Sequence, residues 1–272
     1  MADAQLVQAQ EQYLRDKAAS PTGFLRHVPT FRDGYDMATG KVFETLLKAE
    51  FGEWEDAKGL EGDDDLTVLR SLHTMAHERF GDMVNTFSQV AADDDPSLNA
   101  DGRLKIAVRI IEPKLAKLAE LAEREFARVD EAIKHDEAEI AKAVRVADPI
   151  DIAVHSDIRA HIRSLSGSKA AMAAHIAINS GDLQTLQAIA SAPAYMTGLV
   201  VDGEPHSAYL AVQRALQERM APNHTRRVDA LRLGKARALQ ALSALDRKAN
   251  KFLDFKRARQ LIEREVKRGA AT

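Results

Sequence analysis

The sequence predicts an all-α protein: an elongated multi-helix bundle with two long helices of about 45 residues each and an irregular N-terminal arm. In residues 103–147 and 224–268, apolar residues recur at alternating steps of three and four, the spacing of one stripe on a helix. At 1.5 Å per residue, each such helix would be about 68 Å long. Only 5% of the 272 residues are aromatic, which favours helices packed through Leu, Ala and Val over a wide globular core.

The composition excludes several kinds of site. The chain has no cysteine, so it forms no disulfide, thiolate metal site or cysteine nucleophile. Its net charge of −3 argues against a general polyanion binder. The polar, helical start lacks the basic and apolar regions of a signal peptide, and no apolar run approaches the roughly 18 residues that span a bilayer. We therefore expect cytoplasmic synthesis and no membrane span.

Residues 1–62 are expected to form a helix over 3–19 followed by an irregular arm. Prolines and glycines punctuate residues 20–40, yet this stretch is rich in apolar side chains. Seven of the chain's 14 aromatic residues precede residue 55. Apolar side chains in an irregular segment need a surface to cover, on the chain's own helices or on a neighbouring subunit. The arm residues that we expect to bind a partner are Phe24, Phe31 and Tyr35.

Residues 63–148 are expected to form a long helical hairpin. Asp63, Asp64 and Asp65 offer an N-cap for a helix that extends to about residue 92, where a second acidic triplet and Pro96 end it. Both triplets are interpreted as capping residues, because the ligand spacing of a calcium loop is missing. In the following long helix, Pro113 lies off the apolar stripe, so we expect a bend there and not an end.

Residues 149–222 are expected to form shorter helices and one apolar loop. Gly167 and Gly181 separate the helices, and the loop over residues 191–205 carries apolar side chains between Gly and Pro residues. Asp202 and Gly203 form a turn signal, so either a small hairpin or a buried plug would fit. The loop residues that we expect to bind a partner are Tyr195, Met196 and Leu199.

Residues 223–272 are expected to form the second long helix, which is strongly basic. Lys235 interrupts its apolar stripe, a substitution that can fix the register of packed helices. Phosphate contact requires only cations at loose spacing, so this helix is a candidate for nucleic-acid binding of low specificity. The basic residues that we expect to bind a partner are Arg226, Arg227, Arg232, Lys248, Lys251 and Arg257.

The charges are unevenly distributed. Residues 52–101 contain 13 acidic and 3 basic residues, whereas residues 214–268 contain 16 basic and 6 acidic residues. Three explanations remain open. The two regions are solvated surfaces, or they attract each other between subunits, or the basic end contacts nucleic acid or an acidic partner.

Few motifs suggest chemistry. His73 and His77 are four residues apart on a helix, the spacing that lets two imidazoles share a metal ion, but no third ligand accompanies them. We expect them to be half-buried structural histidines. Ser166–Lys169 matches a bare SxxK pattern without its companion motifs, and we interpret it as a helix start. No phosphate-binding glycine motif occurs, so we expect no catalytic residue, cofactor or metal.

Three features resemble structural proteins of tailed bacteriophages: Ala-rich helices without cysteine, an aromatic irregular N-terminal arm, and a basic helical C-terminus. The stretch GDLQTLQAIASAPAYMTGL, residues 181–199, also resembles a segment of uncharacterised prophage proteins. The resemblance implies a virion or scaffold-type protein in a soluble assembly, and it implies no site residue.

Three functions follow as hypotheses. The first is a non-enzymatic structural protein that forms homo-oligomers and binds other assembly components through helices and the N-terminal arm. The alternative is a nucleic-acid-associated protein that binds phosphates through its basic C-terminal helix. The third, an enzyme, would have to assemble carboxylates or histidines across helices.

Overall fold

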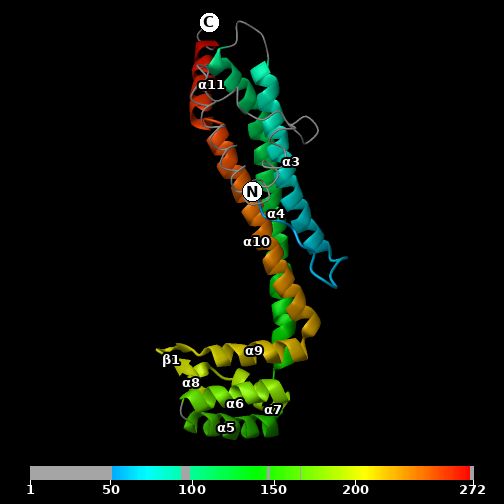
Figure 1. The fold of residues 1–272 in the computed structure, drawn as a ribbon, viewed down its shortest axis with the longest axis vertical. Coiled ribbons are helices and arrows are strands. Elements are labelled where there is room, and N and C mark those ends of the chain that lie inside the picture. The colour runs from blue at the N-terminus through cyan, green and yellow to red at the C-terminus, as the bar shows by residue number, and fades with distance from the viewer. Residues whose placement is uncertain (1–50, 93–98, 146–147, 166, 270–272) are drawn as a thin grey trace, which may run out of the picture. The chain divides into compact units, whose positions relative to one another are not determined.

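The computed structural model describes residues 51–92, 99–145, 148–165 and 167–269. The secondary structure of these residues confirms the predicted all-α class. Figure 1 shows these residues as helices with one small two-stranded sheet. The chain divides into two compact units. Of the described residues, unit 1 contains those up to Val129 and those from Leu233 onward, and unit 2 contains those of Asp130–Arg232. Among the described residues, no helix combines the length and apolar character needed to cross a bilayer.

Unit 1 packs α3 (Asp64–Ala92), the first part of α4 (Ala100–Val144), the last part of α10 (Pro222–Phe252) and α11 (Phe255–Gly269) around apolar stripes. The buried side chains of these stripes include Leu69, Leu72, Phe80, Met83, Ile111, Leu118, Leu245 and Leu253. The first predicted long helix is confirmed by α4, which has 45 residues. As predicted, it continues through Pro113.

Small residues on α10 let α3 approach closely. Ala238, Ala241 and Ala244 are each fully buried. A Cβ atom on Gly234 would lie 3.1 Å from Leu69 Cδ1 and 3.1 Å from Trp54 Cη2. Any larger side chain at position 234 therefore displaces the side chains that pack α3 against α10.

The prediction of a second uninterrupted long helix was wrong. Residues 222–269 form two helices, α10 with 31 residues and α11 with 15 residues, separated by Leu253 and Asp254. Oδ1 of Asp254 accepts a hydrogen bond from the Arg257 amide at 2.8 Å, the geometry of an N-cap. Leu253 is 1% exposed. Burial of Leu253 and capping by Asp254 together end one helix and begin the next.

The first acidic triplet does cap a helix. Oδ1 of Asp63 accepts hydrogen bonds from the amides of Asp65 and Leu66, each at 3.0 Å, so Asp63 is the N-cap of α3. The second triplet lies outside the described residues, as do Phe24, Phe31 and Tyr35 of the predicted arm.

Unit 2 is built around a short central helix. Besides the end of α4 and the start of α10, its helices are α5 (Pro149–Ser164), α6 (Gly167–Ser180), α7 (Leu183–Ala190), α8 (Ala194–Thr197) and α9 (Ser207–Met220). Helix α7 packs against α5, α6 and α9, and its Leu186 and Ile189 are fully buried. Leu186 and Ile189 of α7 therefore belong to the hydrophobic core of unit 2.

Of the two alternatives that the sequence left open for residues 191–205, a small hairpin or a buried plug, the structure has the hairpin. Strands β1 (Val200–Val201) and β2 (Glu204–Pro205) pair antiparallel, with Val201 opposite Glu204. The turn residues Asp202 and Gly203 have φ angles of 52° and 86°. Positive φ at both central residues is the conformation of a type I′ turn, whose twist matches that of the paired strands. Aspartate and glycine adopt positive φ more readily than most residues, so Asp-Gly suits this turn.

Candidate functional site

His73 and His77 belong to an aromatic cluster at the start of unit 1. The His73 and His77 ring centroids are 4.9 Å apart, and His77 lies 4.6 Å from Phe51. Nε2 of His73 is 3.2 Å from the Gly52 carbonyl oxygen. Burial lowers the pKa of both histidines, which favours their neutral forms. These contacts support the structural interpretation of the pair, and no group of three or more metal-ligating side chains occurs among the described residues.

Several of the basic residues expected to bind a partner form ion pairs within the chain. Arg227 donates to Oδ2 of Asp136 at 2.6 Å, Arg232 pairs with Glu137, and Arg257 lies 2.7 Å from Asp101. Arg226 is exposed and Lys248 is half-buried. The side chain of Lys251 lies outside the described residues.

Unit 1 brings the acidic N-terminal region and the basic C-terminal region together. Arg237 lies 2.7 Å from Glu55, and Arg257 lies 2.7 Å from Asp101. Both pairs join residues 52–101 to residues 214–268. Attraction between the two regions therefore operates within one chain, an arrangement that was not among the three explanations drawn from the sequence.

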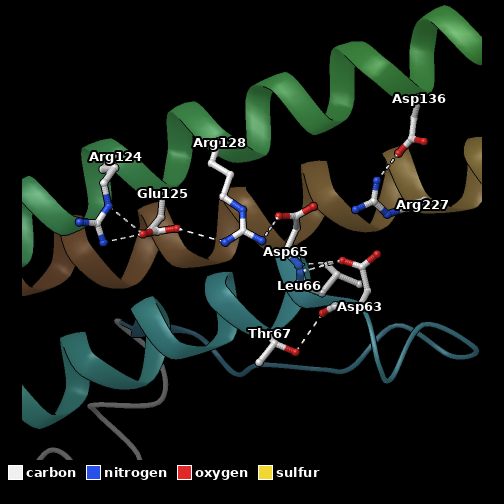
Figure 2. A network of polar contacts seen from close by, with 9 residues as sticks. All are labelled: Asp63, Asp65, Leu66, Thr67, Arg124, Glu125, Arg128, Asp136 and Arg227. Carbon is white, nitrogen blue, oxygen red and sulfur yellow. Dashed lines mark hydrogen bonds and ion pairs between the residues drawn. The ribbon is translucent and has the colours of Figure 1, made fainter.

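In the part of unit 2 where α4 lies beside α10, the buried carboxylate of Asp136 on α4 contacts two residues of α10. Asp136 is 2% exposed, and its two oxygens contact His224 Nδ1 at 2.7 Å and Arg227 Nη1 at 2.6 Å. Figure 2 shows the Arg227 contact. His224 and Arg227 are three residues apart on α10, so they lie on one face of that helix.

Sequence reasoning missed Asp136. The available signal was the seven-residue gap between Ile133 and Ile140 in the apolar stripe of α4. Asp136 occupies the stripe position inside that gap. A polar residue at such a position predicts a specific partner on the facing helix.

A second polar network lies in unit 1, where the start of α3 meets α4. Arg128 lies 3.0 Å from Oδ1 of Asp65 and 3.8 Å from Oε2 of Glu125. Arg124 lies 2.7 Å from Oε1 of the same Glu125 (Figure 2). Asp65 is 8% exposed. Its pairing holds the capped first turn of α3 against α4.

The apolar loop residues of unit 2 have different environments. Tyr195 is 67% exposed and Met196 is 44% exposed, so both are accessible to a partner. Leu199 is 1% exposed and packs in the core of unit 2. The expectation that Leu199 contacts a partner is corrected accordingly, because the turn into β1 directs this side chain inward.

Comparisons with known proteins assign no family to the chain. No family model, no curated protein and no solved structure matches it.

Proposed function

We propose that this protein is a non-enzymatic structural protein whose copies associate through unit 2. One observation carries the proposal. Thirteen large apolar side chains are exposed in the described residues, and nine of them belong to unit 2. These nine are Ile150, Ile152, Met172, Ile176, Leu183, Tyr195, Met196, Val201 and Leu210.

The placement of these side chains supports a contact surface on α6 and α8. Met172 and Ile176 are four residues apart on α6 and are 63% and 60% exposed, so they share its outer face. Tyr195 and Met196 are adjacent on α8. Burial of apolar surface contributes about 25 cal/mol per Å², and exposed apolar patches commonly mark protein interfaces.

We infer that the partner is a second copy of this chain, because closed homo-oligomers are the commonest assemblies of soluble proteins. Virion or scaffold assembly is the biological setting that we propose. It rests on the resemblance to bacteriophage structural proteins, and the resembling stretch of residues 181–199 includes Tyr195 and Met196.

Light scattering coupled to size exclusion tests this proposal on the full chain. We expect a multimer for the natural sequence and a shift toward monomer for the double variant Met172→Ser, Ile176→Ser. The matched control is Leu239→Ser, because Leu239 is 43% exposed on α10 in unit 1. It should leave the assembly state unchanged.

The same experiment addresses the nucleic-acid alternative. The absorbance ratio of the eluting peak at 260 and 280 nm reports bound nucleic acid, and phosphate-mediated binding collapses as salt is raised. A strict monomer that carries nucleic acid would overturn the assembly proposal in favour of the alternative.

A further inference from the structure

Unit 2 contains a cavity of about 400 Å³ between the end of α4 and helices α5, α7 and α9. Such a volume lies within the range of roughly 300–1,000 Å³ that is typical of small-molecule pockets. The cavity is lined by Ala141, Val144, Arg145, Ile152, His155, Arg159, Ala190, Ser191 and Leu216.

One face of α5 supplies both the polar and the apolar parts of the wall. Ile152, His155 and Arg159 follow one another at steps of three and four, so they lie along one side of this helix. Across the cavity, Val144 and Leu216 add aliphatic surface. The wall therefore combines an apolar patch with a polar end.

The polar end is cationic. Among the residues that the structure describes, Arg145 and Arg159 line the cavity and no carboxylate does. Nη1 of Arg159 donates to the Ala188 carbonyl oxygen at 3.2 Å and to Ser191 Oγ at 3.4 Å, both uncharged acceptors. Within the described part of the chain, neither arginine forms an ion pair. A guanidinium group that has no acidic partner is suited to a carboxylate or phosphate group.

His155 provides a second, independent observation. Its side chain is 1% exposed, and its Nε2 atom is buried without a hydrogen-bond partner in the described structure. Burial lowers the pKa of His155, an effect to which Arg159 adds and which Asp151 opposes. His155 lines the cavity, and buried polar atoms are nearly always hydrogen-bonded, so its unpartnered nitrogen needs a polar partner there, either a water molecule or part of a ligand.

We propose that this cavity binds a small organic anion. A carboxylate or phosphate monoester group lies against Arg145 and Arg159, with His155 Nε2 hydrogen-bonded to it. The carbon body of the ligand packs on Val144, Ile152 and Leu216. This site does not involve α6 or α8, where the proposed contact surface lies, and it requires no chemical step.

Calorimetric titration of the full chain with three probes tests the proposal. Phenyl phosphate and benzoate carry the two candidate head groups on the same ring, and inorganic phosphate lacks the apolar body. We expect phenyl phosphate or benzoate to bind, and inorganic phosphate to bind at least about tenfold more weakly. The better of the two ring compounds identifies the head group.

Variants then locate the site. Arg159→Gln should weaken binding about tenfold or more. The matched control Arg163→Gln should bind as the natural chain does, because Arg163 is exposed on the same helix and does not line the cavity. If Arg159→Gln fails to fold, Arg145→Gln replaces it, since Arg145 is exposed just after the end of α4.

NMR gives a readout that does not depend on the arginines. The bound probe should shift the imidazole signals of His155 and leave those of His175, which is exposed on α6, unchanged. Three results would each overturn the proposal: no binding of either ring compound at millimolar concentration, undiminished binding by the arginine variants, or equal affinity for inorganic phosphate and phenyl phosphate.

Discussion

The Nδ1 atom of His224 lies 2.7 Å from Oδ1 of Asp136, and this contact joins α10 to α4 inside unit 2. Asp136 is 2% exposed, whereas the His224 side chain is 43% exposed. The other Asp136 oxygen contacts Arg227 at 2.6 Å. A buried carboxylate is therefore compensated by two partners that remain partly in contact with water.

Asp136→Ala is expected to lower the free energy of unfolding by roughly 1–3 kcal/mol, because Arg227 and His224 lose their contacts with the buried carboxylate. Urea denaturation followed by circular dichroism measures the change. Glu131→Ala is the control, since the Glu131 side chain is 73% exposed and pairs only with its neighbour Lys134 in the described structure. A loss in Asp136→Ala no larger than that of the control would contradict the structural role of Asp136.

Stability is expected to fall as the pH falls below about 6.5, the pKa of an unperturbed histidine. The pKa values of His73 and His77 are lowered in the folded chain, chiefly by burial. The unfolded chain therefore takes up protons first, so this contribution is present above the unfolded pKa and is lost as the pH falls through the folded pKa. Denaturation midpoints at pH 7.5 and 5.5 measure it.

His77→Phe should reduce this pH dependence while keeping the ring contact with Phe51. His175→Gln should leave it unchanged, because His175 is exposed. An unaltered pH dependence in His77→Phe would show that other groups are responsible.

Two helical glycines provide a matched test of packing between α3 and α10. Gly81→Ala should raise the free energy of unfolding by up to about 1 kcal/mol, because alanine favours helix and nothing lies within 4 Å of the added Cβ. Gly234→Ala should gain less or destabilise, since its Cβ would meet Leu69 and Trp54 at 3.1 Å. Thermal denaturation of both variants measures the difference, and equal gains would show that the contact at Gly234 is relaxed.

Alanine substitutions at two glycines with positive φ in unit 2 distinguish the cost of backbone strain from the cost of steric crowding. Gly203 has a φ of 86° and open space around its Cβ direction, so Gly203→Ala should cost about 1 kcal/mol. Gly198 has a φ of 72°, and its Cβ would lie 3.2 Å from the Arg163 Cα atom. Gly198→Ala should therefore cost more than Gly203→Ala in chemical denaturation. The reverse order would argue against the tight packing of α8 on α5.

Asp254→Ala should destabilise α11 by about 1 kcal/mol, the usual cost of losing an N-cap. Asp254→Asn should retain most of the stability, because an amide oxygen can accept the same hydrogen bond from the Arg257 amide. Amide hydrogen exchange of residues 255–260 measures the opening of the first turn. Protection that is unchanged in Asp254→Ala would mean that packing alone defines the start of α11.

Local patterns in the sequence predicted the position of one long helix, one helix cap and one turn. The 3-4 spacing of apolar residues predicted α4, and the acidic triplet that begins with Asp63 predicted the cap of α3. The Asp-Gly pair predicted a turn but left open whether the loop was a hairpin or a buried plug. Each of these features depends on residues that are close in the sequence, where helix periodicity and turn conformation act directly.

Only the tertiary structure determined which distant residues meet, where the cavity lies and where the second long helix is interrupted. Asp136 meets His224 across 88 residues of sequence, and Arg237 meets Glu55 across 182. The cavity beside His155 collects side chains from several helices, and the second long apolar pattern breaks where Leu253 is buried. The reason is physical: a side chain's spacing predicts which face of a helix it occupies, but only the packing of other helices on that face determines whether it meets solvent, an opposite charge or an empty volume.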